Sequence, residues 1–126
     1  MAPISMLAPQ EPARLDIEIL SDLYGDMGPS AAEEAVCRAM EELALRLAEA
    51  ERAFRGDDWL ELGNGLRRVT AIARQIGMVG LVRVARDCRA CLEAGDSVAL
   101  AATLARLLRT GEKSLLALWD RPGLLP

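Results

Sequence analysis

The chain has 126 residues, of which 52% are hydrophobic and 27% are charged, and its formal net charge is −4. This length suits one domain, and this hydrophobic content argues against an intrinsically disordered chain. The negative charge gives no general reason to expect nucleic acid as a partner. No apolar run reaches the roughly 18 residues of a membrane-spanning helix, so we expect no membrane partner either.

Two scarce residue types exclude whole classes of site. The sequence contains no histidine, which excludes His-dependent metal sites, His-assisted nucleophiles and phosphohistidine. Aromatic residues make up only 3% of the chain, so a base-stacking platform is not expected. We therefore expect no catalytic residue, no cofactor and no metal.

The two ends of the chain are predicted to be tails around one domain. Residues 1–13 are expected to form a flexible N-terminal tail; they have no basic region and carry prolines at positions 3, 9 and 12, so they do not look like a signal peptide. A cytoplasmic protein is therefore expected. The domain is predicted over residues 14–121, and residues 122–126 form a short C-terminal tail.

Turn and capping residues divide the chain into helices rather than strands. Asp16 is expected to cap a short first helix, from residue 17 to about residue 24. Ser30 and Glu33 have the spacing of a capping box, which predicts a second helix that runs to about Arg55.

Three further helices are predicted after this point. Asp58 and Glu61 repeat the capping pattern and start a third helix, which ends near Gly77. The fourth and fifth helices are expected near residues 79–94 and 98–119. Long helices with short connections predict an all-α fold, an antiparallel up-down four-helix bundle with the short first helix added at its N-terminus.

Apolar residues at spacings of three and four predict which face of each long helix enters the core. Gly111 lies inside the fifth helix, where we expect some bending or fraying. The expected core positions are Val36, Met40, Leu43, Leu47, Ala50 and Phe54, then Leu62, Leu66, Val69, Ala73 and Ile76, then Leu81, Val84 or Ala85, Cys88 and Leu92, and finally Ala101, Leu104, Leu108, Leu115 and Leu118.

The three cysteines are Cys37, Cys88 and Cys91. The spacing of Cys88 and Cys91 is typical of redox and zinc sites, but no second pair and no histidine complete a tetrahedral zinc site. Free cysteines on a helix often serve as small apolar side chains. Because Arg86 and Arg89 lie nearby and would favour a thiolate, a thiol-based redox-responsive regulator stays open as an alternative.

Charge is unevenly distributed along the chain. Residues 11–51 contain eleven acids and three arginines, a balance of −8, and residues 61–90 contain six arginines and two acids, a balance of +4. Pairing of the two halves across the bundle is the simplest explanation. The alternative is that the basic half attracts an acidic partner.

Helical geometry selects one face of the third helix for such a partner. With the apolar stripe buried, Arg67 lies about 160° around the helix from Val69 and faces outward. Small and polar residues surround it, and Ala71 leaves room for the backbone of another protein. The candidate partner-binding residues are Asn64, Arg67, Arg68, Thr70, Ala71 and Arg74.

The helix order and several motifs over about residues 14–120 resemble a histidine-containing phosphotransfer (HPt) domain. In that family an acidic, polar turn precedes the active helix, a His-x-Leu-Lys-Gly-like motif follows, and a glycine lies ten residues after the histidine. The matching segments are Gly56-Asp57-Asp58-Trp59-Leu60-Glu61-Leu62, Ile76-Gly77-Met78, Leu92-Glu93 and Gly95-Asp96.

The sequence departs from the family at the centre of its motif. Counting back ten residues from Gly77 places Arg67 where the phosphorylated histidine would be, with Val69, Thr70 and Ala71 in place of the motif's leucine, lysine and glycine. A guanidinium group stays protonated and is not nucleophilic, so it cannot relay phosphate.

The resemblance therefore implies a pseudo-HPt module of a two-component phosphorelay that is not an enzyme. Its expected partner is a response-regulator receiver, whose acidic pocket Arg67 would enter, or a histidine kinase. The redox-responsive regulator and a purely structural helical-bundle subunit remain the alternatives.

Overall fold

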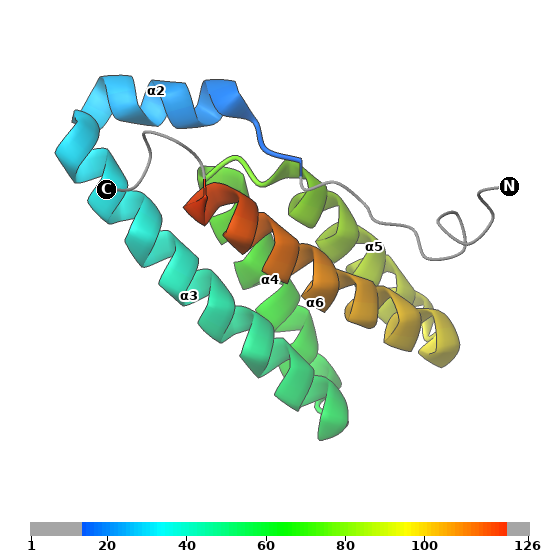
Figure 1. Ribbon diagram of the computed structural model, residues 1–126. Coiled ribbons are helices and arrows are strands. Elements are labelled where there is room, and N and C mark those ends of the chain that lie inside the picture. The colour runs from blue at the N-terminus through cyan, green and yellow to red at the C-terminus, as the bar shows by residue number, and fades with distance from the viewer. Residues whose placement is uncertain (1–13, 121–126) are drawn as a thin grey trace, which may run out of the picture.

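The computed structural model describes residues 14–120, which form five helices and, within that range, no strand (Figure 1). The helices are α2 (Ile17–Met27), α3 (Pro29–Arg55), α4 (Trp59–Gln75), α5 (Val79–Ala94) and α6 (Ser97–Trp119). The predicted all-helical class is confirmed. The predicted tails, 1–13 and 122–126, lie outside the described residues. None of these five helices is both long and apolar enough to cross a bilayer.

The four longer helices lie side by side (Figure 1). Helix α3 packs against α4, α4 against α5, α5 against α6, and α6 in turn touches α3. Helix α2 packs against α3. All five helices contribute buried apolar side chains to one continuous core, from Leu20 in α2 to Leu118 in α6.

The start of α2 agrees with the sequence prediction, but its end and the start of α3 do not. The Asp16 carboxylate accepts hydrogen bonds from the backbone amides of Glu18 (3.0 Å) and Ile19 (3.4 Å). The helix continues to Met27, beyond the expected end near residue 24, and stops at Gly28, which has φ +83°.

The predicted capping box of Ser30 and Glu33 is wrong. Helix α3 begins at Pro29, and Ser30 is already inside its first turn. The N-cap is Gly28, which makes no side-chain capping hydrogen bond. Proline favours the first position of a helix because its φ is already helical and the missing amide would have had no partner there.

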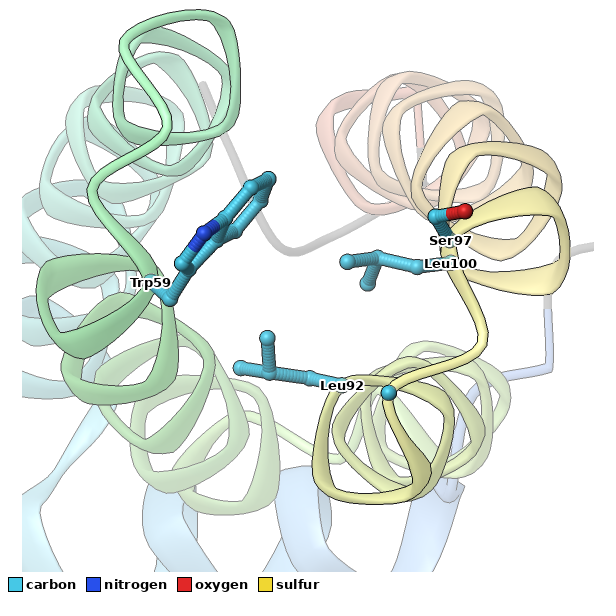
Figure 2. A pocket seen from close by; sticks show the side chains of 5 residues that line it. Trp59, Leu92, Ser97 and Leu100 are labelled. Carbon is cyan, nitrogen blue, oxygen red and sulfur yellow. The ribbon is translucent and has the colours of Figure 1, made fainter.

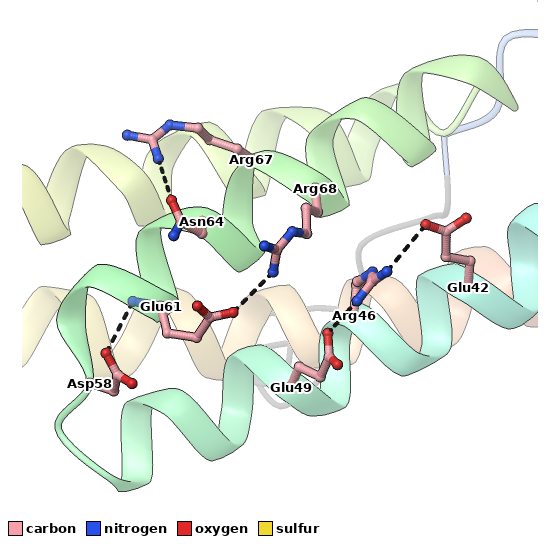
Figure 3. A network of polar contacts seen from close by, with 8 residues as sticks. All are labelled: Glu42, Arg46, Glu49, Asp58, Glu61, Asn64, Arg67 and Arg68. Atoms are coloured by element: carbon pink, nitrogen blue, oxygen red, sulfur yellow. Dashed lines mark hydrogen bonds and ion pairs between the residues drawn. The ribbon is translucent and has the colours of Figure 1, made fainter.

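The caps of α4 and α6 are aspartates. The Asp58 carboxylate accepts a hydrogen bond from the Glu61 amide at 3.1 Å, as predicted (Figure 3). The Glu61 carboxylate binds Arg68 at 2.9 Å instead of returning to the cap, so the second half of this predicted capping box is not formed. Asp96 caps α6 in the same way through the Ala99 amide, at 3.0 Å.

The predicted core faces of α3, α4 and α5 are buried, with Phe54 and Leu92 half-buried at their edges. The predicted face of α6 is partly wrong, because Ala101 is exposed and Leu108 and Leu115 are only half-buried. The buried positions of α6 are Leu100, Leu104, Leu107, Gly111, Ser114 and Leu118.

Gly111 does not interrupt α6, so the expected bending or fraying is not found. A Cβ atom at this position would lie 2.6 Å from the Cδ1 atom of Leu47 in α3. The missing side chain therefore allows α6 to approach α3 closely, which is a packing role for this glycine.

The segment before α2 is held against the connection between α4 and α5. The Asp16 amide donates a hydrogen bond to the Gly77 carbonyl at 2.7 Å, and the Gly80 amide donates to the Arg14 carbonyl at 3.4 Å. Gly77 has φ +74°, and a Cβ atom there would lie 2.8 Å from the Asp16 carbonyl oxygen. Both the backbone conformation and the close approach require glycine at position 77.

Candidate functional site

The outer face of α4 presents Arg67 to solvent, as predicted. Its Nη1 atom donates a hydrogen bond to the Oδ1 atom of Asn64 at 2.9 Å (Figure 3). The neighbouring Leu66 and Val69 are completely buried. Ala71 and Arg74 are exposed and Asn64 is half-buried, so four predicted partner-binding residues are available on this helix. The guanidinium group of Arg67 is free to meet a partner.

Arg68 is exposed but belongs to a different side of α4. Its Nη1 atom lies 2.9 Å from the Oε1 atom of Glu61. Figure 3 shows Arg68 pointing toward α3 and Arg67 pointing away from it. The structure therefore does not bring these two arginines together. An exposed ion pair of this kind contributes about 0–1 kcal/mol to stability, and its main effect here is to neutralise the charge of Arg68.

The prediction that Thr70 belongs to the contact surface is wrong. Thr70 is only 6% exposed, and its hydroxyl group donates a hydrogen bond to the Leu66 carbonyl oxygen at 2.9 Å. Thr70 lies four residues after Leu66 and three before Ala73, and both of these residues are fully buried. This spacing places it beside the apolar stripe rather than beside Arg67.

Ion pairing separates the arginines of this protein into two groups. Among residues 14–120, carboxylates pair with Arg38, Arg46, Arg55, Arg68 and Arg106. No carboxylate in that range forms an ion pair with the arginines of the second group, which are Arg14, Arg52, Arg67, Arg74, Arg83, Arg86, Arg89 and Arg109. Five of these eight arginines lie on α4 or α5.

The acidic charge of α3 is compensated mainly within that helix. Arg46 binds Glu49 at 2.8 Å and lies 3.7 Å from Glu42 (Figure 3). The hydrogen bond from Arg46 lowers the pKa of the Glu49 carboxyl group, and it raises the pKa of Arg46 itself. Among the described ion pairs, only the one between Arg106 and Asp87 joins two helices. Pairing between the two halves of the chain therefore does not account for the unpaired arginines.

Two arginines of α5 add further unpaired positive charge to that of α4. Asp87 marks the side of α5 that faces α6, because its Oδ2 atom lies 3.6 Å from Arg106 of α6. At about 100° per residue, Arg86 and Arg89 lie about 100° and 160° away from Asp87 around α5, and so away from the side that pairs with α6. We call Arg67, Arg74, Arg86 and Arg89 the arginine surface. The charge balance of residues 61–90 signals this surface, but the sequence does not show which arginines find partners.

The cysteines do not form a metal or disulfide site. Cys88 is completely buried, whereas Cys37 and Cys91 are half-buried, and all three are free thiols. Burial raises the pKa of the Cys88 thiol, although a hydrogen bond with Thr103 acts in the opposite direction. Within residues 14–120, no three His, Cys, Asp or Glu side chains are grouped so that they could hold a metal ion. Cys88 acts as an apolar side chain of the core.

We predict that Cys88 reacts with iodoacetamide at pH 7.5 roughly 100-fold more slowly than Cys37 and Cys91 in the folded protein, because a buried thiol reacts only after local opening and a raised pKa leaves little thiolate. The rate should rise with pH as the thiol ionises. Mass spectrometry of timed samples measures each site, and the same reaction in urea provides the control with all three thiols exposed. Equal labelling of Cys88 and Cys91 in the folded protein would instead favour a redox role.

The comparisons with known proteins give no match. No family model, no curated protein and no solved structure is significantly similar to the chain. The function of the arginine surface is therefore argued from its own residues.

Proposed function

We propose that the protein is a pseudo-HPt module, which binds a response-regulator receiver or a histidine kinase of a two-component system without carrying phosphate. On this proposal α3 to α6 form an antiparallel up-down bundle of the HPt type. The short connections support that arrangement, since only residues 56–58, 76–78 and 95–96 separate the four helices. The module is a binding protein and not an enzyme.

The position and exposure of Arg67 carry this proposal. Arg67 lies in the middle of α4, ten residues before Gly77, at the position that the HPt resemblance gives to the phosphorylated histidine. Its side chain reaches solvent, and its hydrogen-bond partner is the neighbouring Asn64 rather than a carboxylate. A cation therefore stands where the family presents its reactive imidazole.

The chemistry of a guanidinium group suits binding and excludes phosphate transfer. It remains protonated and donates several hydrogen bonds in a plane, which fits a carboxylate in a two-point contact. A receiver presents carboxylates around its phosphorylatable aspartate, so Arg67 would pair with them and form a complex that does not react. The other members of the arginine surface add positive potential that speeds the approach of an acidic pocket.

The experiment is a calorimetric titration of the protein with the receiver domains and kinases of its own organism. We predict that Arg67→Glu abolishes binding because it places like charges together. Arg67→Ala should weaken binding by about 1–3 kcal/mol, the range for losing a charge-assisted contact. Ala71→Trp should also prevent binding, because a large side chain one turn away blocks the approach of the partner backbone.

Arg109→Ala provides the matched control, since Arg109 is an exposed arginine on α6 without an ion pair among the described residues. Circular dichroism should give the same helix content for all variants. The loss of affinity should be larger at low salt, because the contact is ionic. A partner whose binding is changed by neither Arg67→Glu nor Ala71→Trp would contradict this proposal.

A further inference from the structure

A recess opens at the end of the molecule where α4 and α6 begin and α5 ends. Its volume is about 330 Å³, and it is lined by Trp59, Leu92, Gly95, Ser97 and Leu100. In Figure 2 the indole ring of Trp59 stands on one side of the opening, and the side chains of Leu92 and Leu100 point toward it from the other helices. The recess is mainly apolar, and its volume is at the lower end of the range for small ligand pockets.

Trp59 and two large apolar residues that neighbour lining residues in the sequence are not covered. Trp59 is 46% exposed, Leu60 is 79% exposed and Val98 is 80% exposed. The Trp59 ring is held by an edge-to-face contact with Phe54, with ring centroids 6.1 Å apart. Exposed apolar groups gathered beside a recess are typical of a site where a partner inserts an anchoring side chain.

The charged residues of the chain segments that supply the recess lining are all acidic. Residues 57–61 and 92–102 contain five acids and no lysine or arginine. Glu61 is neutralised by Arg68, and Asp58 and Asp96 accept hydrogen bonds from helix amides. Asp57 and Glu93 are exposed, and within residues 14–120 neither forms an ion pair. These two carboxylates are therefore free to bind a cation.

We propose that this recess is a second interaction surface, which binds a basic amphipathic segment of another protein. A leucine, methionine or tryptophan of that segment fills the space between Trp59, Leu92 and Leu100, and its lysines or arginines pair with Asp57 and Glu93. The apolar anchor supplies affinity, and the carboxylates select the charge of the partner. The sign of the charge is opposite to that of the arginine surface, so the two surfaces bind different partners, and this inference does not depend on the proposed function.

The test uses a synthetic 14-residue peptide of leucine and lysine, with its leucines on one helical face, and a matched peptide with glutamate in place of lysine. The Trp119→Phe variant leaves Trp59 as the one tryptophan of the chain and so reports on the recess alone. We expect saturable binding of the lysine peptide with a Kd of about 1–100 μM and a shift of Trp59 emission to shorter wavelength. The glutamate peptide should not bind.

Variants locate the binding on the protein. Trp59→Ala should raise the Kd for the lysine peptide at least about tenfold, equivalent to about 1.4 kcal/mol. Trp119→Ala is the matched control, because Trp119 is 59% exposed near the other end of α6, and it should leave affinity unchanged. Ser97→Phe fills the recess and should also prevent binding, so the test does not depend on the stability of Trp59→Ala. Asp57→Asn combined with Glu93→Gln should weaken binding at low salt and have less effect at high salt.

Several results would overturn the proposal. These are the absence of saturation below about 1 mM, equal binding of the two peptides, and equal affinities of Trp59→Ala and Trp119→Ala. A dimer of the protein that the lysine peptide dissociates would assign the recess to a second copy of the chain instead, and analytical ultracentrifugation without peptide detects it.

Discussion

Gly77→Ala should lower the free energy of unfolding by about 2–4 kcal/mol, because it combines backbone strain, a steric contact and a lost hydrogen bond. Alanine disfavours the positive φ of +74° at this position, and its Cβ atom would lie 2.8 Å from the Asp16 carbonyl oxygen. Relief of that contact requires Asp16 to move, which breaks the 2.7 Å hydrogen bond from its amide to the Gly77 carbonyl. Urea unfolding monitored by circular dichroism measures the change.

Gly95→Ala separates the two causes. Gly95 has nearly the same φ, +69°, but no atom lies within 4 Å of the position that its Cβ atom would occupy. The free energy of unfolding of this variant should therefore fall only by the cost of the backbone strain, about 1–2 kcal/mol. If Gly77→Ala and Gly95→Ala were equally destabilised, the contact between residue 77 and Asp16 would have no energetic importance.

The close approach of α6 to α3 predicts a strong coupling between Gly111 and Leu47. Gly111→Leu should destabilise the protein by about 1–3 kcal/mol through overpacking, and Leu47→Ala should cost about 2–5 kcal/mol by leaving a cavity. The double variant should be destabilised by clearly less than the sum of the two single effects, because the new leucine side chain occupies the space that Leu47 leaves. Urea denaturation of the four proteins completes the double-mutant cycle.

Leu62→Ala provides the control for that cycle. Leu62 is also fully buried but lies near the start of α4. Its effect should add to that of Gly111→Leu within about 0.5 kcal/mol, as expected for separate sites. Additive effects of Gly111→Leu and Leu47→Ala would instead show that α3 and α6 adjust independently.

Local signals in the sequence predict most of the helices. Asp16 and Asp58 cap helices as expected, because a short carboxylate directly before the first helical turn accepts hydrogen bonds from the free backbone amides of that turn. Ser30 looks equally suitable, but the proline before it takes the first helical position and makes the serine cap unnecessary. The predicted register of α6 is partly wrong, because leucines lie on both sides of the buried stripe and because Gly111 and Ser114 occupy buried positions without giving an apolar signal.

The surface around Arg67 can be partly predicted from the sequence, whereas the recess cannot. The outward orientation of Arg67 follows directly from the helical period, whereas Thr70 lies at the edge of the apolar stripe, where the period does not decide between core and surface. The recess at the end of the molecule was not predicted, because its lining comes from three helices and depends on how they pack. The exposed Trp59 directly after two aspartates was the available signal.

The order of packing described above has a consequence for the kinetics of folding. Each of α2 to α5 packs against the helix that follows it in the chain, so most of the core consists of contacts between near neighbours in sequence. Long-range contacts include the contact of α6 with α3 and the hydrogen bonds of Asp16 with Gly77 and of Gly80 with Arg14. Topologies rich in local contacts fold rapidly, and closing a long loop costs entropy, so we expect these long-range contacts to form after the rate-limiting step. Stopped-flow measurements should therefore show Leu47→Ala accelerating unfolding while the folding rate stays nearly unchanged.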